Sequence, residues 1–192
     1  MIEQEIKYIS QQEYLDFERF ALDKNEYFEG EIFVINGASI VHNIISMNCL
    51  FYISSHLKGK IYESFGSKFR IHIPENTFYA YPDLTVFSDN INTTDENEDT
   101  ATNPIVIFEV QSKQFRTFNK ENRFALYRQI KSLKEYILID YKKVNVEKHT
   151  RIDDNSWQLT EFKNLNQTLE LNSIQIELKL SEIYDRTKII KS

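Results

Sequence analysis

The spacing of apolar positions predicts three helices in this chain. Apolar residues recur at helical intervals over about 11–23, 39–59 and 119–135. The first segment opens with Ser10 and Glu13 in the S-x-x-E spacing of a capping box, and the second opens with a serine and closes on a glycine. These boundary signals support the assignment of both segments as helices.

Shorter runs rich in β-branched and aromatic residues predict strands between and after the helices. They read, in order, EYFEGEIFVING, IYESF, KFRIHI, YPDLTVF, PIVIFEV, YILIDY, KVNVEKHT, SWQLTEF and LELNSIQIEL. We interpret the first run as one strand ending in a turn, and the next four as a single meander. The order predicts one α/β domain over residues 1–192, with a mixed central sheet flanked by helices and a β-rich C-terminal tail.

One carboxylate interrupts an otherwise apolar run. Glu109 lies near the end of PIVIFEV, where burial of an unpaired carboxylate would cost several kcal/mol. Asp83 begins another apolar run, directly after Pro82. If the two strands are neighbours, the carboxylates repel unless a cation lies between them, and such hard oxygen donors select Mg²⁺ or Mn²⁺. The spacing equally allows Asp83 to be a turn residue and Glu109 to pair with a lysine or arginine.

Composition narrows the class of protein. The chain has 192 residues, 41% hydrophobic and 14% aromatic, which suits one globular domain with a substantial core. Its single cysteine, Cys49, cannot form an internal disulfide, so we expect a reducing compartment, the cytoplasm. The N-terminal residues lack an apolar signal core and no run approaches the roughly 18 to 20 apolar residues of a bilayer span, so no membrane association is expected.

Charge is segregated along the chain. The net charge of −6 argues against a protein that coats nucleic acid indiscriminately. However, cations concentrate between Lys113 and Lys134, whereas residues 89–99 hold five acids and no base. The basic segment is either a solvated helix face or a phosphate-contacting surface. We expect the acidic segment to be a mobile loop.

The order of these motifs resembles a known family. A P-D pair followed by a loop and a glutamate beyond an apolar strand is similar to the PD-(D/E)XK nuclease superfamily. Over nearly the whole chain, the sequence resembles the Uma-two family of restriction endonucleases. The matching pieces are EYLDFE, EYFEGEIFVINGAS, the histidine at position 42, YPDLTVF, NPIVIFEVQS, FALYRQIKSLKEYILID and LSEIY.

The resemblance implies a restriction-endonuclease-like core and divalent-metal-dependent hydrolysis of phosphodiester bonds. Its metal ligands would be Asp83, Glu109 and the carbonyl of Val110. Glu31 matches a recurrent acid of the family and would complete the catalytic site. Glu26 matches a second acid that we rank below Glu31, with capping of a helix or strand as the alternative.

Two departures from the family pattern bear on catalysis. The usual nuclease lysine two residues after the glutamate is Gln111 here, and Arg123 stands at a helical position where the family often has lysine. The aspartate near that position in the family is Asn119. Lysine would neutralise charge in the transition state, glutamine only orients water, and arginine, with a pKa above about 12, cannot act as a base.

We therefore expect an endonuclease that acts on DNA with Mg²⁺ or Mn²⁺, and leave open a homodimer. Gln111 would position water while Arg123 and Lys120 balance phosphate charge, with Lys113 and His42 as further contacts and Tyr127 lining the groove. The other three histidines are interpreted as structural. Two alternatives remain: a catalytically weakened nuclease fold that only binds nucleic acid, and a subunit for protein interaction.

Overall fold

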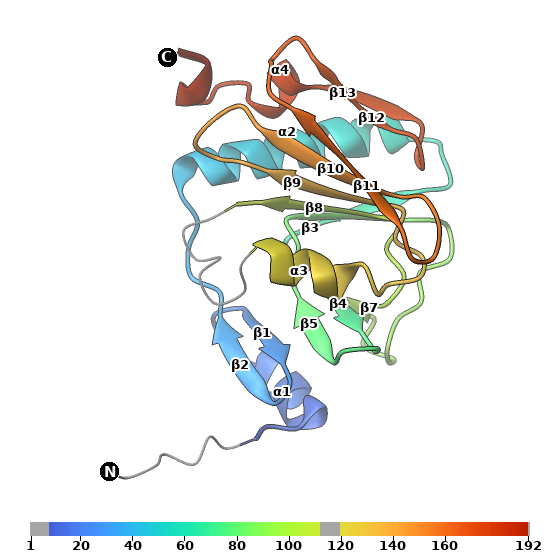
Figure 1. Cartoon of the computed structure of the whole chain (residues 1–192). Helices are drawn as coiled ribbons and strands as arrows, with labels where there is room; N and C mark the ends of the chain where they lie inside the picture. Colours follow the sequence, from blue (N-terminus) through green and yellow to red (C-terminus); the bar gives the residue numbers. More distant parts are fainter. Residues whose placement is uncertain (1–7, 112–119, 192) are drawn as a thin grey trace.

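The computed structural model describes residues 8–111 and 120–191, without the side chains of 120–122, 190 and 191. Two β-sheets, with helices against them, make up most of this part of the chain (Figure 1). The mixed α/β class and the restriction-endonuclease-like architecture are confirmed, with the C-terminal β-rich tail as expected. None of the helices in these described ranges has the length and apolar character needed to cross a bilayer.

The larger sheet has six strands in the order β11-β10-β9-β8-β6-β3. Only β8 and β9 run parallel, and the other neighbours are antiparallel. The central strands are buried along their whole length, which explains their nearly continuous apolar sequences. Their bounds are β3 Glu63–Gly66, β6 Leu84–Phe87, β8 Val106–Val110, β9 Glu135–Ile139, β10 Val146–Arg151 and β11 Trp157–Phe162.

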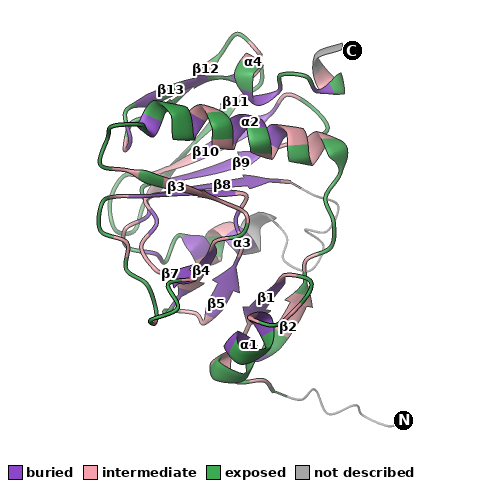
Figure 2. Cartoon of the chain, turned by 180° about the vertical axis from the view of Figure 1, so that it is seen from behind, coloured by how far each residue is buried: buried purple, intermediate pink, exposed green. Residues whose placement is uncertain are grey.

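Helix α2, Ile40–Leu57, covers one face of this sheet together with the C-terminal hairpin (Figures 1 and 2). Ile45, Cys49 and Ile53 on α2 belong to the same apolar cluster as Val86 and Phe108 on the strands. Ser39 caps the helix as predicted, by accepting a hydrogen bond from the backbone N–H of residue 42. The C-terminal elements are β12 Thr168–Leu171, β13 Ile176–Lys179, α4 Leu180–Ile183 and the short η1 Lys188–Lys191.

The opposite face is covered by α3, Lys120–Tyr127, and by a second, five-stranded sheet. That sheet has the order β2-β1-β5-β4-β7. Phe78 from the second sheet, Ile107 from the larger sheet and Tyr127 from α3 meet in one apolar cluster. The remaining strands are β1 Asn25–Phe28, β2 Glu31–Val34, β4 Arg70–Ile73, β5 Phe78–Ala80 and β7 Thr100–Ala101.

The segment interpreted as one strand and a turn is a tight hairpin. Its β1 and β2 are joined by Glu29 and Gly30, whose φ angles are 48° and 90°. Two successive positive φ angles define the two-residue turn whose twist matches the flanking strands. A Cβ atom on Gly30 would lie 2.3 Å from the Tyr8 ring, so glycine is required at this position for space as well as for φ.

The predicted meander was wrong. Strands β4 and β5 pair with each other in the second sheet, where β5 also pairs with β1, while β3, β6 and β8 lie in the larger one. The chain changes sheet between Ala80 and Leu84, where Pro82 lacks the N–H that a continuing ladder needs. Two helices are also shorter than predicted: α1 spans Gln11–Glu18, and α3 ends at Tyr127 because Glu135 already belongs to β9.

Candidate active site

Asp83 and Glu109 lie side by side at the edge where β6 begins and β8 ends. Strands β6 and β8 are antiparallel neighbours with Leu84 opposite Phe108, so the next position along the ladder sets Asp83 beside Glu109. Both residues line one open cavity of about 700 Å³. The condition under which the sequence predicts converging carboxylates, that their strands be neighbours, is therefore met.

Helix α2 supplies the partners of Asp83. The Ser46 hydroxyl donates to Asp83 Oδ1 at 3.0 Å, and His42 Nε2 lies 3.4 Å from Asp83 Oδ2. Asp83 Oδ2 also accepts a hydrogen bond of 2.8 Å from the backbone N–H of Val110. Because His42 and Ser46 are four residues apart, they lie on the same side of the helix and face the carboxylate together. Asp83 is thus held by groups from α2 and β8.

The surroundings of His42 favour its charged form. Burial lowers the pKa of His42, but the hydrogen bond and charge of Asp83, the charge of Glu109 and the carbonyl of Val110 raise it by more. The net result is a pKa above the ordinary histidine value. His42 is therefore set up to donate a proton or a hydrogen bond within the cavity.

Glu109 is buried and held from α3. Its Oε1 accepts hydrogen bonds from Arg123 Nη2 at 2.7 Å and from the Tyr127 hydroxyl at 2.6 Å. Burial raises the pKa of Glu109 to about 7, and Asp83 and Glu26 add to this, against the opposing effect of Arg123. The alternative in which Glu109 pairs with an arginine is the arrangement that the structure has.

Arg123 joins Glu109 to a third carboxylate. Its Nη1 and Nη2 bind the two carboxylate oxygens of Glu26 at 2.8 and 2.9 Å, while Nη2 also binds Glu109. Only 6% of Arg123 is exposed, so its contacts lie within the protein. One buried guanidinium thus connects α3, β1 and β8, and Arg123 does not lie on an exposed basic helix face.

The structure brings Glu26 to the cavity and leaves Glu31 outside it. Glu26 lines the cavity, whereas Glu31 is exposed at the start of β2 and is absent from its wall. The hairpin register accounts for the difference, since Glu26 pairs with Phe33 and Glu31 pairs with Phe28 beside the turn. The order in which the sequence ranked the two acids is therefore reversed in the geometry.

The other predicted site residues are placed less closely around the carboxylates. Gln111 follows β8, is half-buried, and donates its backbone N–H to the Ile139 carbonyl at 2.8 Å, but it does not line the cavity. Lys113 and Asn119 lie outside the described residues. Lys120 begins α3, but its side chain lies outside them too.

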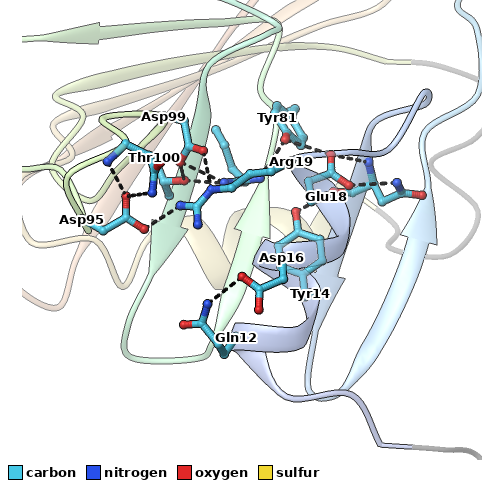
Figure 3. A network of polar contacts seen from close by, with 12 residues as sticks. Gln12, Tyr14, Asp16, Glu18, Arg19, Tyr81, Asp95, Asp99 and Thr100 are labelled. Atoms are coloured by element: carbon cyan, nitrogen blue, oxygen red, sulfur yellow. Dashed lines mark hydrogen bonds and ion pairs between the residues drawn. The ribbon is translucent and has the colours of Figure 1, made fainter.

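Glu18 forms part of the cavity wall and orients β1 (Figure 3). Its Oε1 accepts from the backbone N–H of Asn25 and from the Tyr81 hydroxyl, both at 2.9 Å, and its Oε2 accepts from the Asn25 side chain at 2.8 Å. This carboxylate does the capping that was the alternative role for Glu26. Because Asn25 adjoins Glu26, the network sets the position of the strand that faces Arg123.

The acidic segment is anchored, contrary to the expectation of a mobile loop. Arg19 binds Asp95 at 2.6 Å and Asp99 at 2.9 Å, and Arg70 binds Asp99 at 3.0 Å (Figure 3). Asp95 and Asp99 thus pair with Arg19, which directly follows α1, and with Arg70 on β4. Hydrogen bonds from Arg19 hold the pKa of Asp95 below its usual value. Burial raises the pKa of Asp99, but Arg19, Thr100 and Arg70 together lower it by more.

Ser46, Lys24 and Lys68 are among the cavity residues that have no part in the sequence-based site. Ser46 had a signal, since it follows His42 at the i+4 spacing of one helix face. Lys24 lies two residues before Glu26, but this spacing at the start of a strand does not indicate a functional site. Lys68 lies in a turn and had no signal at all.

The donors around Asp83 suit a small divalent cation. Two carboxylates and the carbonyl of Val110 are hard oxygen ligands, and Mg²⁺ is usually held by one or two carboxylates together with substrate phosphates. Within the described ranges, no three His, Cys, Asp or Glu side chains are grouped as a metal centre. The donor types thus suit such an ion, while Glu109 also accepts hydrogen bonds from Arg123 and Tyr127.

Comparison with known proteins gives first the class and then the family. A crystal structure described as a putative nuclease belonging to DUF820, from Anabaena variabilis, superposes with a TM-score of 0.75 at 20% identity, covering 92% of this chain and 97% of that one. This likeness shows a nuclease-like fold. The model of the Uma-two (Uma2) family, described as "Putative restriction endonuclease", matches residues 11–182, and the chain belongs to this family.

Two relatives come from Synechocystis sp. The uncharacterized protein sll1609 is 36% identical over 170 residues, covering 88% of this chain and 96% of that protein. The uncharacterized protein slr1290 is 28% identical over 176 residues, covering 92% and 91%. The similarity therefore extends over nearly the full length of both relatives.

Proposed function

We propose that this protein is a metal-dependent endonuclease that hydrolyses phosphodiester bonds of DNA in the cavity around Asp83 and Glu109. The observation that carries the proposal is the adjacent placement of Asp83, directly before β6, and Glu109 on β8, both lining one open cavity. Membership of a restriction endonuclease family supports the reaction class. DNA as substrate follows from that class.

Asp83, Glu109 and the Val110 carbonyl would hold Mg²⁺ or Mn²⁺. When bound, such an ion lowers the pKa of water and polarises the phosphodiester. Asp83 is preorganised for this role, because Ser46 and the backbone N–H of Val110 already orient both its oxygens. Nothing in the chain has to rotate Asp83 before an ion binds.

His42 would hold or deliver a proton beside Asp83. Burial lowers the pKa of His42, but its contacts with Asp83 and the Val110 carbonyl raise it by more, so the protonated imidazole would lie beside the carboxylate that a phosphate approaches. Arg123 acts as a positioning residue, since it touches Glu109 and Glu26 from within the protein.

Nicking of supercoiled plasmid DNA with Mg²⁺ or Mn²⁺ tests the proposal. Wild type and Glu31→Gln should nick the plasmid, because Glu31 is an exposed carboxylate outside the cavity, whereas Asp83→Asn should not. Equal cleavage by wild type and Asp83→Asn would place the activity elsewhere or in a contaminant. Full activity in EDTA would show that cleavage does not require a divalent metal.

One observation favours a second candidate, a nuclease fold that binds nucleic acid without cutting it. Glu109 already has a cation, Arg123, at 2.7 Å, which reduces its need for a metal ion. This candidate predicts salt-sensitive DNA binding by wild type and no cleavage with any divalent metal. If the protein does cleave both strands of a duplex, two copies would supply two cavities, and light scattering with and without DNA would measure that homodimer.

A further inference from the structure

We propose that Lys24 and Lys68, which line the cavity together with the carboxylates, form its phosphate-binding wall and supply the positive charge that meets the nucleic-acid backbone. This inference deepens the proposed function, on which it rests for the identity of the ligand. Neither lysine is in the basic segment between Lys113 and Lys134 where the sequence concentrates its cations. The wall is instead built by two distant segments.

Acids outnumber cations among the residues that line the cavity, so a bound phosphate needs cations that are still available. Five acids line the cavity against two lysines, Arg123 and His42, and both Arg123 and His42 already contact carboxylates. Arg123 makes three hydrogen bonds to Glu26 and Glu109. A phosphodiester approaching this cavity carries a negative charge toward a net negative surface, so it needs cations that are still available. The acids are Glu18, Asp23, Glu26, Asp83 and Glu109.

Local geometry brings the two lysines together. Lys24 immediately precedes β1, and its Nζ donates to the carbonyl of Ser67 at 2.6 Å. Ser67 adjoins Lys68 in the turn after β3, so this bond places both lysines on one wall. Within the described part of the chain, no carboxylate lies at ion-pair distance from Lys24 or Lys68. Neither lysine is therefore held in an ion pair, although the charges of Asp83 and Glu26 act on Lys24 from a longer distance.

The surroundings of Lys24 suit an anionic ligand. Lys24 is half-buried, and its Nζ lies 5.4 Å from the centre of the Tyr81 ring. Burial lowers the pKa of Lys24, and the charge of Lys68 adds to this, whereas Asp83 and Glu26 act in the opposite direction. A phosphate group bound between the lysines would offset the cost of holding two like charges in a partly buried place. Lysine suits this role because its compact ammonium group moves on a flexible stem.

Binding of a labelled DNA duplex in EDTA, measured over a range of salt, tests the wall without requiring cleavage. Lys24→Met and Lys68→Met should each weaken binding and reduce the slope of log K against log salt by about 0.9 per lost phosphate contact. Lys24→Arg retains the charge and should keep the wild-type slope. Lys58→Met is the matched control, because Lys58 is an exposed lysine just beyond the other end of α2.

The outcomes separate this inference from the proposed function. Cleavage by wild type together with unchanged salt slopes in Lys24→Met and Lys68→Met would overturn the wall and leave the nuclease standing. Reduced slopes in a protein that never cleaves would support the wall and overturn the nuclease. An equal loss in Lys58→Met would show a diffuse charge effect and overturn the wall. If Lys24→Met unfolds because the bond to Ser67 is lost, Lys68→Met and Lys24→Arg decide the question.

Discussion

Arg123 on α3 and Glu109 on β8 are joined by a hydrogen bond of 2.7 Å between two buried side chains. The same guanidinium binds Glu26 through both of its terminal nitrogens. Two elements from the second half of the chain and one from the first therefore meet at a single cation. The charge state of the cavity therefore depends on the contacts of Arg123 with Glu26 and Glu109.

Removing the cation should strongly destabilise the protein. Arg123→Met leaves Glu26 and Glu109 buried without their partner, and loss of one member of a buried ion pair costs about 3 to 5 kcal/mol. Urea unfolding measures the change. Lys163→Met is the control, since its pair with Glu161 is exposed and should be worth no more than about 1 kcal/mol. A loss for Arg123→Met as small as that of the control would contradict the central role of Arg123.

Stability should fall as pH rises through the titration of Glu109. The pKa of Glu109 in the folded protein is raised from 4.5 to about 7. In that window the folded state binds more protons than the unfolded state, so the free energy of unfolding decreases as pH increases. The effect is about 3 kcal/mol at most, at 1.36 kcal/mol for each pKa unit.

Comparison with Glu109→Gln isolates this contribution. The variant cannot titrate at position 109, so its stability curve should be flatter than that of wild type between about pH 4.5 and pH 7. Thermal unfolding across this range measures both proteins. Parallel curves would mean that Glu109 keeps an ordinary pKa and that Arg123 outweighs its burial.

Divalent metal should stabilise the wild type against heat. Binding to the folded state adds about 2.7 kcal/mol at a hundredfold excess over Kd. Of Asp83 and Glu31, only Asp83 lines the cavity. Asp83→Asn should therefore lose the metal-induced increase in melting temperature, and Glu31→Gln should keep it. An equal increase in the melting temperature of Asp83→Asn would show that the metal binds away from Asp83.

Gln111→Lys should raise metal-dependent cleavage at least about tenfold. Position 111 lies two residues beyond Glu109, which is the strand spacing that places both side chains on one face. The substitution adds a charged donor near the phosphate, and loss of one such donor in other enzymes costs about 2.7 to 4 kcal/mol. Plasmid cleavage is compared between wild type and Gln111→Lys. No gain from the lysine would show that position 111 does not face the phosphate.

Arg19 should control the opening of the acidic segment. Arg19→Gln removes the ion pairs to Asp95 and Asp99 while leaving that from Arg70. The backbone N–H of Thr94, bonded to the Thr100 carbonyl at 3.0 Å, should then exchange faster with solvent. Hydrogen exchange of Arg19→Gln against wild type measures this, and unchanged protection at Thr94 would show that the Arg70 ion pair suffices.

Local patterns and family likeness could be predicted from the sequence alone. The capping box of Ser10 and Glu13 is present at the start of α1, because a cap depends on residues only a few positions apart. The apolar runs around Glu109 and after Asp83 are buried strands, since periodicity reports burial directly. The family resemblance, confirmed by the match over residues 11–182, also rests on motif order along the chain.

Only the tertiary structure decided which charged groups meet. Arg123 and Glu26 are 97 residues apart, and nothing between them in the sequence states that they form a bidentate pair. The division of the predicted meander between two sheets likewise depends on pairing of β1 with β5 rather than on local propensity. The choice of Glu26 over Glu31 at the cavity follows from the hairpin register, and the placement of Lys24 beside Ser67 follows from the packing of two turns. Strand register and long-range pairing are set by the whole core, so the sequence could name the carboxylates but not their partners.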